Sequence, residues 1–210
     1  PEDVGNARNI VVSDQSGKSN IISRLKSIKI NIEENDPKIK KLLDEVKDRE
    51  FIGYSYDGAD ASFELLARRI IGEIPRYISI NEYDVSVKKN KSGDIISSAK
   101  AKLEVDGEKI ICEGEGNGPV NALDNAIRQN VDRLAKYSNY LKDLRLVDYK
   151  VRILNTGTEA VTRVSIESTD SQGKNWFTIG VSTNIIDASF KALIDSLDYK
   201  LFKDNAPASK

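Results

Sequence analysis

Histidine is absent from this chain of 210 residues. Imidazole is the usual general acid and base near neutral pH and a common ligand of transition metals. Its absence excludes Ser-His and Cys-His nucleophile pairs, so we expect no catalytic residue and no metal ion here. Methionine is absent too, including position 1, which Pro1 occupies. We therefore expect that the chain starts through truncation or processing.

Cysteine, long apolar runs and basic blocks are also scarce. The single cysteine, Cys112, cannot form an internal disulfide, and its apolar neighbours predict a core position. No run approaches the roughly 18 apolar residues of a membrane helix, and no signal-peptide pattern opens the chain. Lys and Arg number 32 against 33 Asp and Glu, without a cluster that could neutralise a row of phosphates. We expect a cytoplasmic protein with no membrane partner and no nucleic-acid partner.

The first part of the chain has the spacing of a small helical unit. Apolar residues recur there with a period near 3.6 in three stretches. The second stretch has the clearest start, because Asp36 is a good N-cap and Pro37 suits the first helical position. We expect a short extended segment at 9–13, then helices that begin at Ser19 or Asn20, at Asp36, and over 58–72.

From Tyr77 onward the period changes from 3.6 to 2. Alternating runs at 83–88, 99–105 and 108–113, separated by turn-forming residues, predict three antiparallel strands. A glycine-rich turn at 114–119 then leads into a helix. One apolar stripe marks this helix: Val120, Leu123, Ile127, Val131 and Leu134.

The same order of elements recurs further along the chain. Residues 149–153 repeat 83–87, and Gly180 stands where Gly114 stood, so 149 minus 83 and 180 minus 114 both give an offset of 66. Double-stranded-RNA modules also contain βββα units, but their basic helix start is missing here, where Asn121 stands.

These patterns predict an α+β fold. A small N-terminal helical linker subdomain, 1–75, precedes a duplicated βββα domain, 76–210. Its repeats are 76–138 and 139–203, each a three-stranded antiparallel sheet with one helix.

Six segments carry a resemblance to a known enzyme family. Residues 116–123, 146–154 and 180–189 resemble the regulatory domain of isopropylmalate synthases and citramalate synthases. Upstream, 4–6, 13–21 and 58–66 resemble the linker subdomains of the citramalate branch. The resemblance covers nearly the whole chain and identifies it as the C-terminal linker and regulatory region of such an enzyme.

The resemblance also implies what the rest of the enzyme does. In this family a (β/α) barrel ahead of the linker binds a divalent metal through two histidines and a carboxylate. Acetyl-CoA then adds to a 2-oxo acid there. With no histidine, this chain cannot contain that barrel. We expect no cofactor in the chain itself, and metal and acetyl-CoA in the barrel, with the chain alone inactive.

Feedback inhibition by a branched-chain amino acid is the implied role of the duplicated domain, together with homodimerisation and contact with the enzyme's own barrel. The linker motifs favour citramalate synthesis and therefore isoleucine as the effector. An isopropylmalate synthase that binds leucine and a purely structural dimerisation domain remain as alternatives. We expect these effector-binding residues: Gly116, Asn117, Gly118, Pro119, Leu146, Asp148, Tyr149, Ile153, Ser182, Thr183, Asn184, Ile186 and Ala188.

Elementary chemistry supports such a site. Backbone N-H groups that precede the two helices could hold an α-carboxylate, and Asp148, Asp124 or Asp187 could accept from the ammonium group. Tyr149 and Ile153 share a strand face, whereas Leu146 faces the other side unless a bulge intervenes. The alternative interpretation is an ordinary turn and cap with core aliphatic residues.

Overall fold

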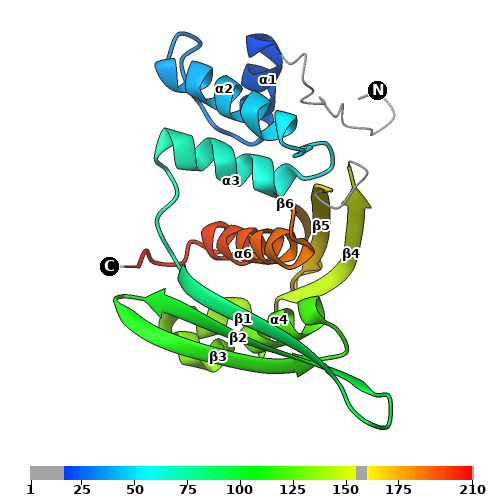
Figure 1. The fold of residues 1–210 in the computed structure, drawn as a ribbon. Helices are drawn as coiled ribbons and strands as arrows, with labels where there is room; N and C mark the ends of the chain where they lie inside the picture. The colour runs from blue at the N-terminus through cyan, green and yellow to red at the C-terminus, as the bar shows by residue number, and fades with distance from the viewer. Residues whose placement is uncertain (1–16, 155–159, 210) are drawn as a thin grey trace.

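A computed structural model describes residues 17–154 and 160–209 of the chain. Three helices are followed by two antiparallel three-stranded sheets, each with a helix after it, as Figure 1 shows. The α+β fold class and the duplicated βββα arrangement are confirmed. The predicted extended segment at 9–13 lies outside the described residues.

The helical unit contains α1 (Lys18–Ser27), α2 (Pro37–Phe51) and α3 (Asp60–Ile71). The predicted cap of the second helix is confirmed, because the side chain of Asp36 accepts a hydrogen bond from the Lys38 amide at 2.8 Å. The predicted cap of the first helix was wrong. Gly17 is the N-cap and makes no side-chain bond, so Ser19 and Asn20 already lie in the first turn.

In the first repeat, three strands precede a short helix. They are β1 (Ser79–Lys89), β2 (Ile95–Val105), β3 (Glu108–Gly116) and α4 (Pro119–Arg128). Two predictions need correction. The helix does not continue to Leu134, because a 3₁₀ segment, η2 (Val131–Tyr137), and a single turn, α5 (Ser138–Leu141), follow α4. In addition, β3 extends through Gly116, so the segment 114–116 is strand rather than turn.

The second repeat consists of β4 (Arg145–Ile153), β5 (Thr162–Thr169), β6 (Asn175–Ser182) and α6 (Ile185–Lys203). Both first strands carry a bulge, between Ile80 and Glu82 in β1 and between Leu146 and Asp148 in β4. These positions differ by the offset of 66. The duplication therefore extends to an irregularity that alternation alone would not show.

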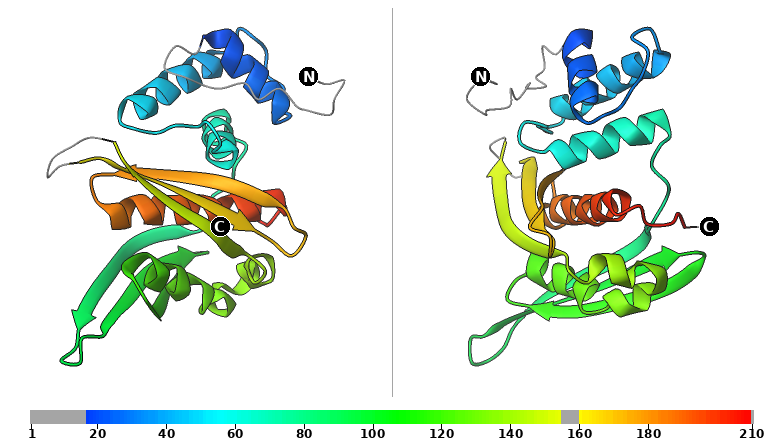
Figure 2. Two further views of the ribbon diagram at one scale, coloured as in Figure 1. Left: turned by 90° about the vertical axis from the view of Figure 1, so that its right-hand side faces the viewer. Right: turned by 180° about the vertical axis from the view of Figure 1, so that it is seen from behind.

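The helices α4 and α6 cover the inner faces of their own sheets and contact each other between them (Figures 1 and 2). One hydrophobic core runs through both repeats, and a second core fills the helical unit and includes Ile179 of β6. Helix α3 lies against α6 and β6, which joins the helical unit to the second repeat. The predicted boundary at residue 75 stays a prediction.

Candidate functional site

The inner face of β4 brings together three of the residues expected at the site. Leu146, Tyr149 and Ile153 pair with Ser168, Ile166 and Thr162, which alternate along the buried face of β5. Strict alternation would put Leu146 and Tyr149 on opposite faces. The bulge at Val147 adds one residue and places Leu146 on the same face as Tyr149. The three side chains therefore form one apolar row.

Asp148 lies on the opposite face of the strand. Asp148 pairs with Glu167, whereas Tyr149 pairs with the buried Ile166, so the two side chains point to opposite faces. The carboxylate of Asp148 contacts Lys150 Nζ at 2.7 Å. The hydrogen bond from Lys150, with that from the Tyr149 amide, holds the pKa of Asp148 below its ordinary value. The structure thus separates Asp148 from the apolar row.

The start of α6 gathers a second group of expected residues. Asn184 is the N-cap, and its side chain accepts from the amides of Ile186 and Asp187 at 2.8 and 3.4 Å. Ser182 Oγ accepts from the Asn184 amide at 3.2 Å, Ile186 is half-buried and Ala188 is fully buried. Thr183 is exposed between the strand and the helix.

Tyr149 connects the apolar row to this helix. Its hydroxyl lies 2.8 Å from Ser189 Oγ, on the side of α6 that covers its own sheet. Asp187 accepts at 3.4 Å from Tyr83 of the first repeat and pairs with Lys191 at 2.8 Å. Although partial burial opposes it, Lys191 and Ser182 hold the pKa of Asp187 below its ordinary value. Asp187 is a carboxylate acceptor close to the β4 row.

Sequence reasoning missed Tyr83, Ser189 and Phe190 as parts of this region. The ring of Phe190 lies 4.3 Å from that of Tyr83, centroid to centroid. The repeat offset gave a signal for Tyr83, since it is the counterpart of Tyr149. No sequence signal indicated that it would reach across to α6 of the other repeat.

Gly116, Asn117, Gly118 and Pro119 form the corresponding start of α4 in the first repeat. Gly118 is the N-cap, Pro119 is the first helical residue, and no side chain caps this helix. The expected residues therefore fall on two equivalent positions, one in each repeat.

Between the repeats lies a cavity of about 10 Å³ whose walls include Leu146, Asp124 and Arg128. Asp124 and Arg128 form an ion pair at 2.8 Å. The space holds about one water molecule, so an amino acid cannot enter without movement of these side chains. The accessible part of the row is its far end, where Val151 and Ile153 are 41% and 68% exposed.

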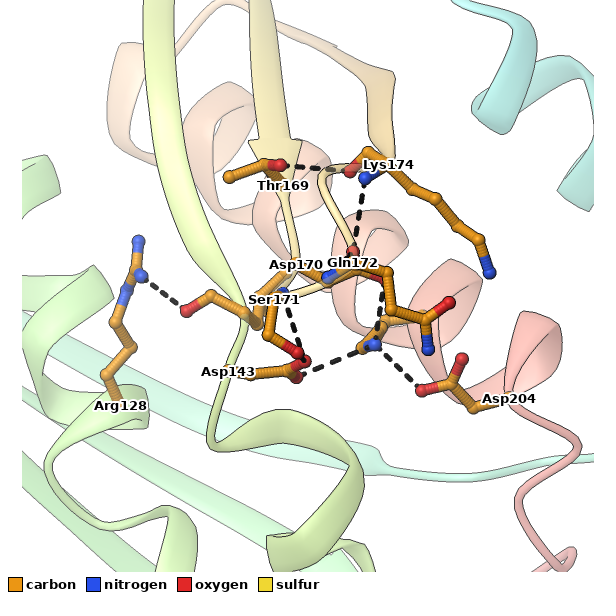
Figure 3. A network of polar contacts seen from close by, with 10 residues as sticks. Arg128, Asp143, Thr169, Asp170, Ser171, Gln172, Lys174 and Asp204 are labelled. Carbon is orange, nitrogen blue, oxygen red and sulfur yellow. Dashed lines mark hydrogen bonds and ion pairs between the residues drawn. The ribbon is translucent and has the colours of Figure 1, made fainter.

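A buried ion network lies at the other end of the second repeat (Figure 3). Lys200 Nζ lies 2.8 Å from Asp204, 3.1 Å from Asp170 and 3.5 Å from Asp143, with its side chain 3% exposed. These residues come from α6, the turn after β5 and the segment before β4. Every charge has a partner, which suits a structural tie rather than a catalytic group.

Contacts also tie the helical unit to the second repeat. Arg69 of α3 contacts Asp195 and Asp198 of α6, both at 2.9 Å. The Gly53 carbonyl, after α2, accepts from Arg163 Nε at 2.6 Å, and a Cβ atom on Gly53 would lie 2.5 Å from Leu154 Cδ1.

In the described ranges, 17–154 and 160–209, no group of three or more Cys, Asp or Glu residues is placed to hold a metal ion. Nor does any helix in those ranges combine the length and apolar character that crossing a membrane requires.

Comparison with known proteins gives one family and several relatives. Residues 57–201 match the LeuA allosteric (dimerisation) domain. The chain is 45% identical to (R)-citramalate synthase of Aquifex aeolicus over 97% of its own length and 38% of that protein. It is 43% identical to the (R)-citramalate synthase of Geobacter sulfurreducens, over 97% of this chain and 38% of that protein. A probable 2-isopropylmalate synthase of Methanopyrus kandleri is 26% identical over 92% of this chain and 37% of its own. The chain thus spans less than two fifths of these relatives and corresponds to their C-terminal part.

Proposed function

Because the chain belongs to the LeuA allosteric (dimerisation) domain family, we propose that it is the feedback-inhibition module of a citramalate synthase-like enzyme and binds isoleucine. The condensation of acetyl-CoA with pyruvate, with its divalent metal, then takes place in a barrel outside this chain. The module acts as a homodimer. Because (R)-citramalate synthases are among the relatives of this chain, we propose isoleucine rather than leucine as its effector.

The observation that carries this proposal is the apolar row Leu146, Tyr149 and Ile153 beside the start of α6. The row offers an aliphatic surface, and Asp187 offers a carboxylate for the ammonium group. The α-carboxylate of the ligand lies at the N-terminal end of α6, where it competes with the Asn184 side chain for the helix amides.

Titration calorimetry with isoleucine, leucine and valine tests the sensor role. We expect saturable binding of isoleucine, and weaker binding by Ile153→Ala of about 5- to 30-fold, the effect of removing an apolar contact worth roughly 1–2 kcal/mol. Val147→Ala is the matched control, since Val147 lies at the bulge of the same strand and is also mostly exposed, 53% against 68% for Ile153. No saturable heat at millimolar concentration of any of the three amino acids contradicts the proposal.

Inhibition requires two states of the enzyme with different effector affinity. The test uses a full-length enzyme that carries this chain, compared with the same enzyme lacking residues 76–210, at saturating isoleucine. We expect the deletion to abolish inhibition. A deleted enzyme that is still inhibited places the effector site elsewhere, and a dimeric chain that binds no effector favours the purely structural role.

A further inference from the structure

The chain turns sharply after α6 and leaves the second repeat. Asn205 takes the left-handed backbone conformation, with a φ of 53°, which asparagine tolerates better than most residues. The Asn205 amide donates to the Phe202 carbonyl at 3.1 Å. The Ala206 amide donates to the Leu201 carbonyl at 2.9 Å, which completes the bond pair of a Schellman motif. Residues 205–209, which we call the strap, therefore have a fixed direction away from α6 (Figure 1).

Two side chains of η2 hold the middle of the strap. Tyr137 Oη donates to the Pro207 carbonyl at 3.0 Å, and Lys136 Nζ donates to the Ala208 carbonyl at 2.6 Å. Ala206, just before them, is 6% exposed and belongs to the core that runs through both repeats. Because two successive carbonyls and the adjacent side chain are all bound, the strap joins the second repeat to the first.

Ser209 of the strap binds two further segments. Its Oγ accepts from the Asp106 amide at 2.8 Å, in the turn between β2 and β3. Its own amide donates to the Arg76 carbonyl at 2.8 Å. Arg76 belongs to residues 72–78, which we call the connector, between α3 and β1. The strap is thus fastened to the covalent path from the helical unit to the sheets.

Tyr137 brings the strap and the connector to one side chain. Its ring lies 6.0 Å from the ring of Tyr77 in the connector, centroid to centroid and nearly edge to face. Its hydroxyl donates to the strap at the same time. Tyr77 and Tyr137 are buried in a close-packed core, so a displacement of the strap also changes the packing of the connector.

The other end of α6 lies at the candidate effector site. Asn184 caps that end, and Ile186 and Asp187 stand in the first turn. A helix of 19 residues is about 28 Å long. Rigid elements of this kind can carry energetic coupling between distant sites. Helix α6 therefore links the effector site physically to the strap.

We propose that the strap transmits the effector's signal from α6 to the connector and so to the helical unit. This inference rests on the proposed function, in which isoleucine binds beside the start of α6. A ligand that shifts α6 also shifts the strap, which repositions the connector through Ser209 and Tyr137. Release of the strap then separates two properties, because isoleucine binding persists while inhibition is lost.

The double substitution Lys136→Met with Tyr137→Phe releases the strap, because it removes both side-chain donors and keeps their apolar bulk. Its matched control is Tyr140→Phe with Lys142→Met, the same two changes a few residues along, where Lys142 Nζ bonds to Asn139. Calorimetry of each whole chain with isoleucine measures binding. We expect every Kd to stay within about 3-fold of the original, because distant sites act nearly independently.

Inhibition is measured in a full-length enzyme that carries this chain, relative to each variant's own rate without isoleucine. The released variant should need about 10-fold more isoleucine for half-inhibition, the size of a typical coupling between sites, and the control should match the original. Faster hydrogen exchange of the Ser209 amide confirms release, because its bond to Arg76 then opens more often. Unchanged inhibition despite faster exchange overturns the proposal and leaves the direct contact of α3 with α6 as the route. Loss of isoleucine binding also overturns it, because the strap would then belong to the binding site.

A chain that ends after Asp204 is the second variant. It lacks the whole strap, so we expect the same loss of inhibition even if the double substitution leaves Ser209 attached. Inhibition of that enzyme at the original isoleucine concentration overturns the proposal. Failure of the proposed function is distinguishable, because the original protein would then show no isoleucine binding or no inhibition before any substitution.

Discussion

Two glycines set the distance between sheet and helix in each repeat. A Cβ atom on Gly114 would lie 2.3 Å from the Ala126 amide nitrogen, and one on Gly180 would lie 2.0 Å from the Ala188 carbonyl oxygen. Neither glycine has a left-handed backbone conformation. Their role is therefore close approach of strand and helix backbones.

We expect Gly180→Ala to lower the free energy of unfolding by about 3 kcal/mol or more, because backbone atoms of α6 must shift to admit the methyl group. Urea unfolding measures the change. Gly118→Ala is the control for close packing, since a Cβ there meets no atom within 4 Å. Because Gly118 is the N-cap of α4, where alanine is less favourable than glycine, we expect a cost of at most about 1 kcal/mol. Equal effects of the two substitutions contradict the close-packing explanation.

Asp198 gives the protein a pH dependence of its own. Burial, with Asp195 nearby, raises the pKa of Asp198 from 3.8 to about 6 despite the contact with Arg69. Between pH 4 and 6 the folded state then binds more protons than the unfolded state. This group's contribution to stability therefore falls as pH rises through that window, by up to about 3 kcal/mol.

Asp198→Asn should remove this contribution. We expect the variant to gain stability relative to the original chain as pH rises from 4 to 7, measured by urea unfolding at each pH. Carboxylates with lowered pKa, such as Asp143 and Asp170, are present in both proteins and cancel in the difference. A difference that stays constant with pH would show that Asp198 titrates normally.

At the scale of elements, the Lys200 network joins three segments of the second repeat. Lys200 lies at the position equivalent to Leu134, which is apolar and fully buried in the first repeat. Lys200→Met leaves Asp143, Asp170 and Asp204 without their shared cation, and we expect a loss of about 3–5 kcal/mol.

Urea unfolding of Lys200→Met and Lys191→Met provides the matched comparison. Lys191 makes a single pair with Asp187, and its side chain is 49% exposed, so its loss should cost less than about 1 kcal/mol. If Lys200→Met is no less stable than Lys191→Met, the network is not a structural tie.

The sequence predicted most elements because their signals are local. Asp36 and Pro37 marked a helix start that the structure confirms, and alternation marked the strands. The helix predicted to reach Leu134 was wrong for a physical reason. In the 3₁₀ segment, Val131 and Leu134 are three residues apart and face the same side, so the apolar stripe continues although the α-helix has ended.

The candidate site was less accessible to sequence reasoning. Tyr149 and Ile153 shared a face by simple alternation, but only the bulge at Val147 aligned Leu146 with them. The separation of Asp148 from that row and the contact between Tyr83 and Asp187 depend on tertiary packing. No spacing along the chain encodes such contacts.

At the scale of the whole molecule, the offset of 66 predicted two similar units but not how they meet. The structure places α4 and α6 in contact between the sheets and docks α3 on α6 and β6. The α3 contact combines apolar packing of Ile179 against the helical unit with ion pairs of Arg69 to Asp195 and Asp198. Such pairs have no periodic signature, so this docking could not be predicted from the sequence.

Both sheets leave the far end of their inner face uncovered in the single chain. Val151 and Ile153 of β4 are exposed, and so is Val87, the counterpart of Ile153 in β1. The chain belongs to a dimerisation-domain family, and both repeats expose an apolar end. These two features favour a two-fold interface, in which each chain contributes the same surface. We infer that these ends pack against a second copy.

Val151→Asp tests that interface by placing a charge in the middle of the apolar row. Burying an unpaired carboxylate is unfavourable, so we expect the dimer to dissociate into monomers, measured by light scattering coupled to size exclusion. Val147→Asp introduces the same charge on the same strand, at a bulge residue that is 53% exposed, and should remain dimeric. If Val151→Asp also stays dimeric, the two chains meet elsewhere. In that outcome the exposed end of β4 stays accessible to isoleucine in the dimer. The affinity for isoleucine should then not depend on protein concentration.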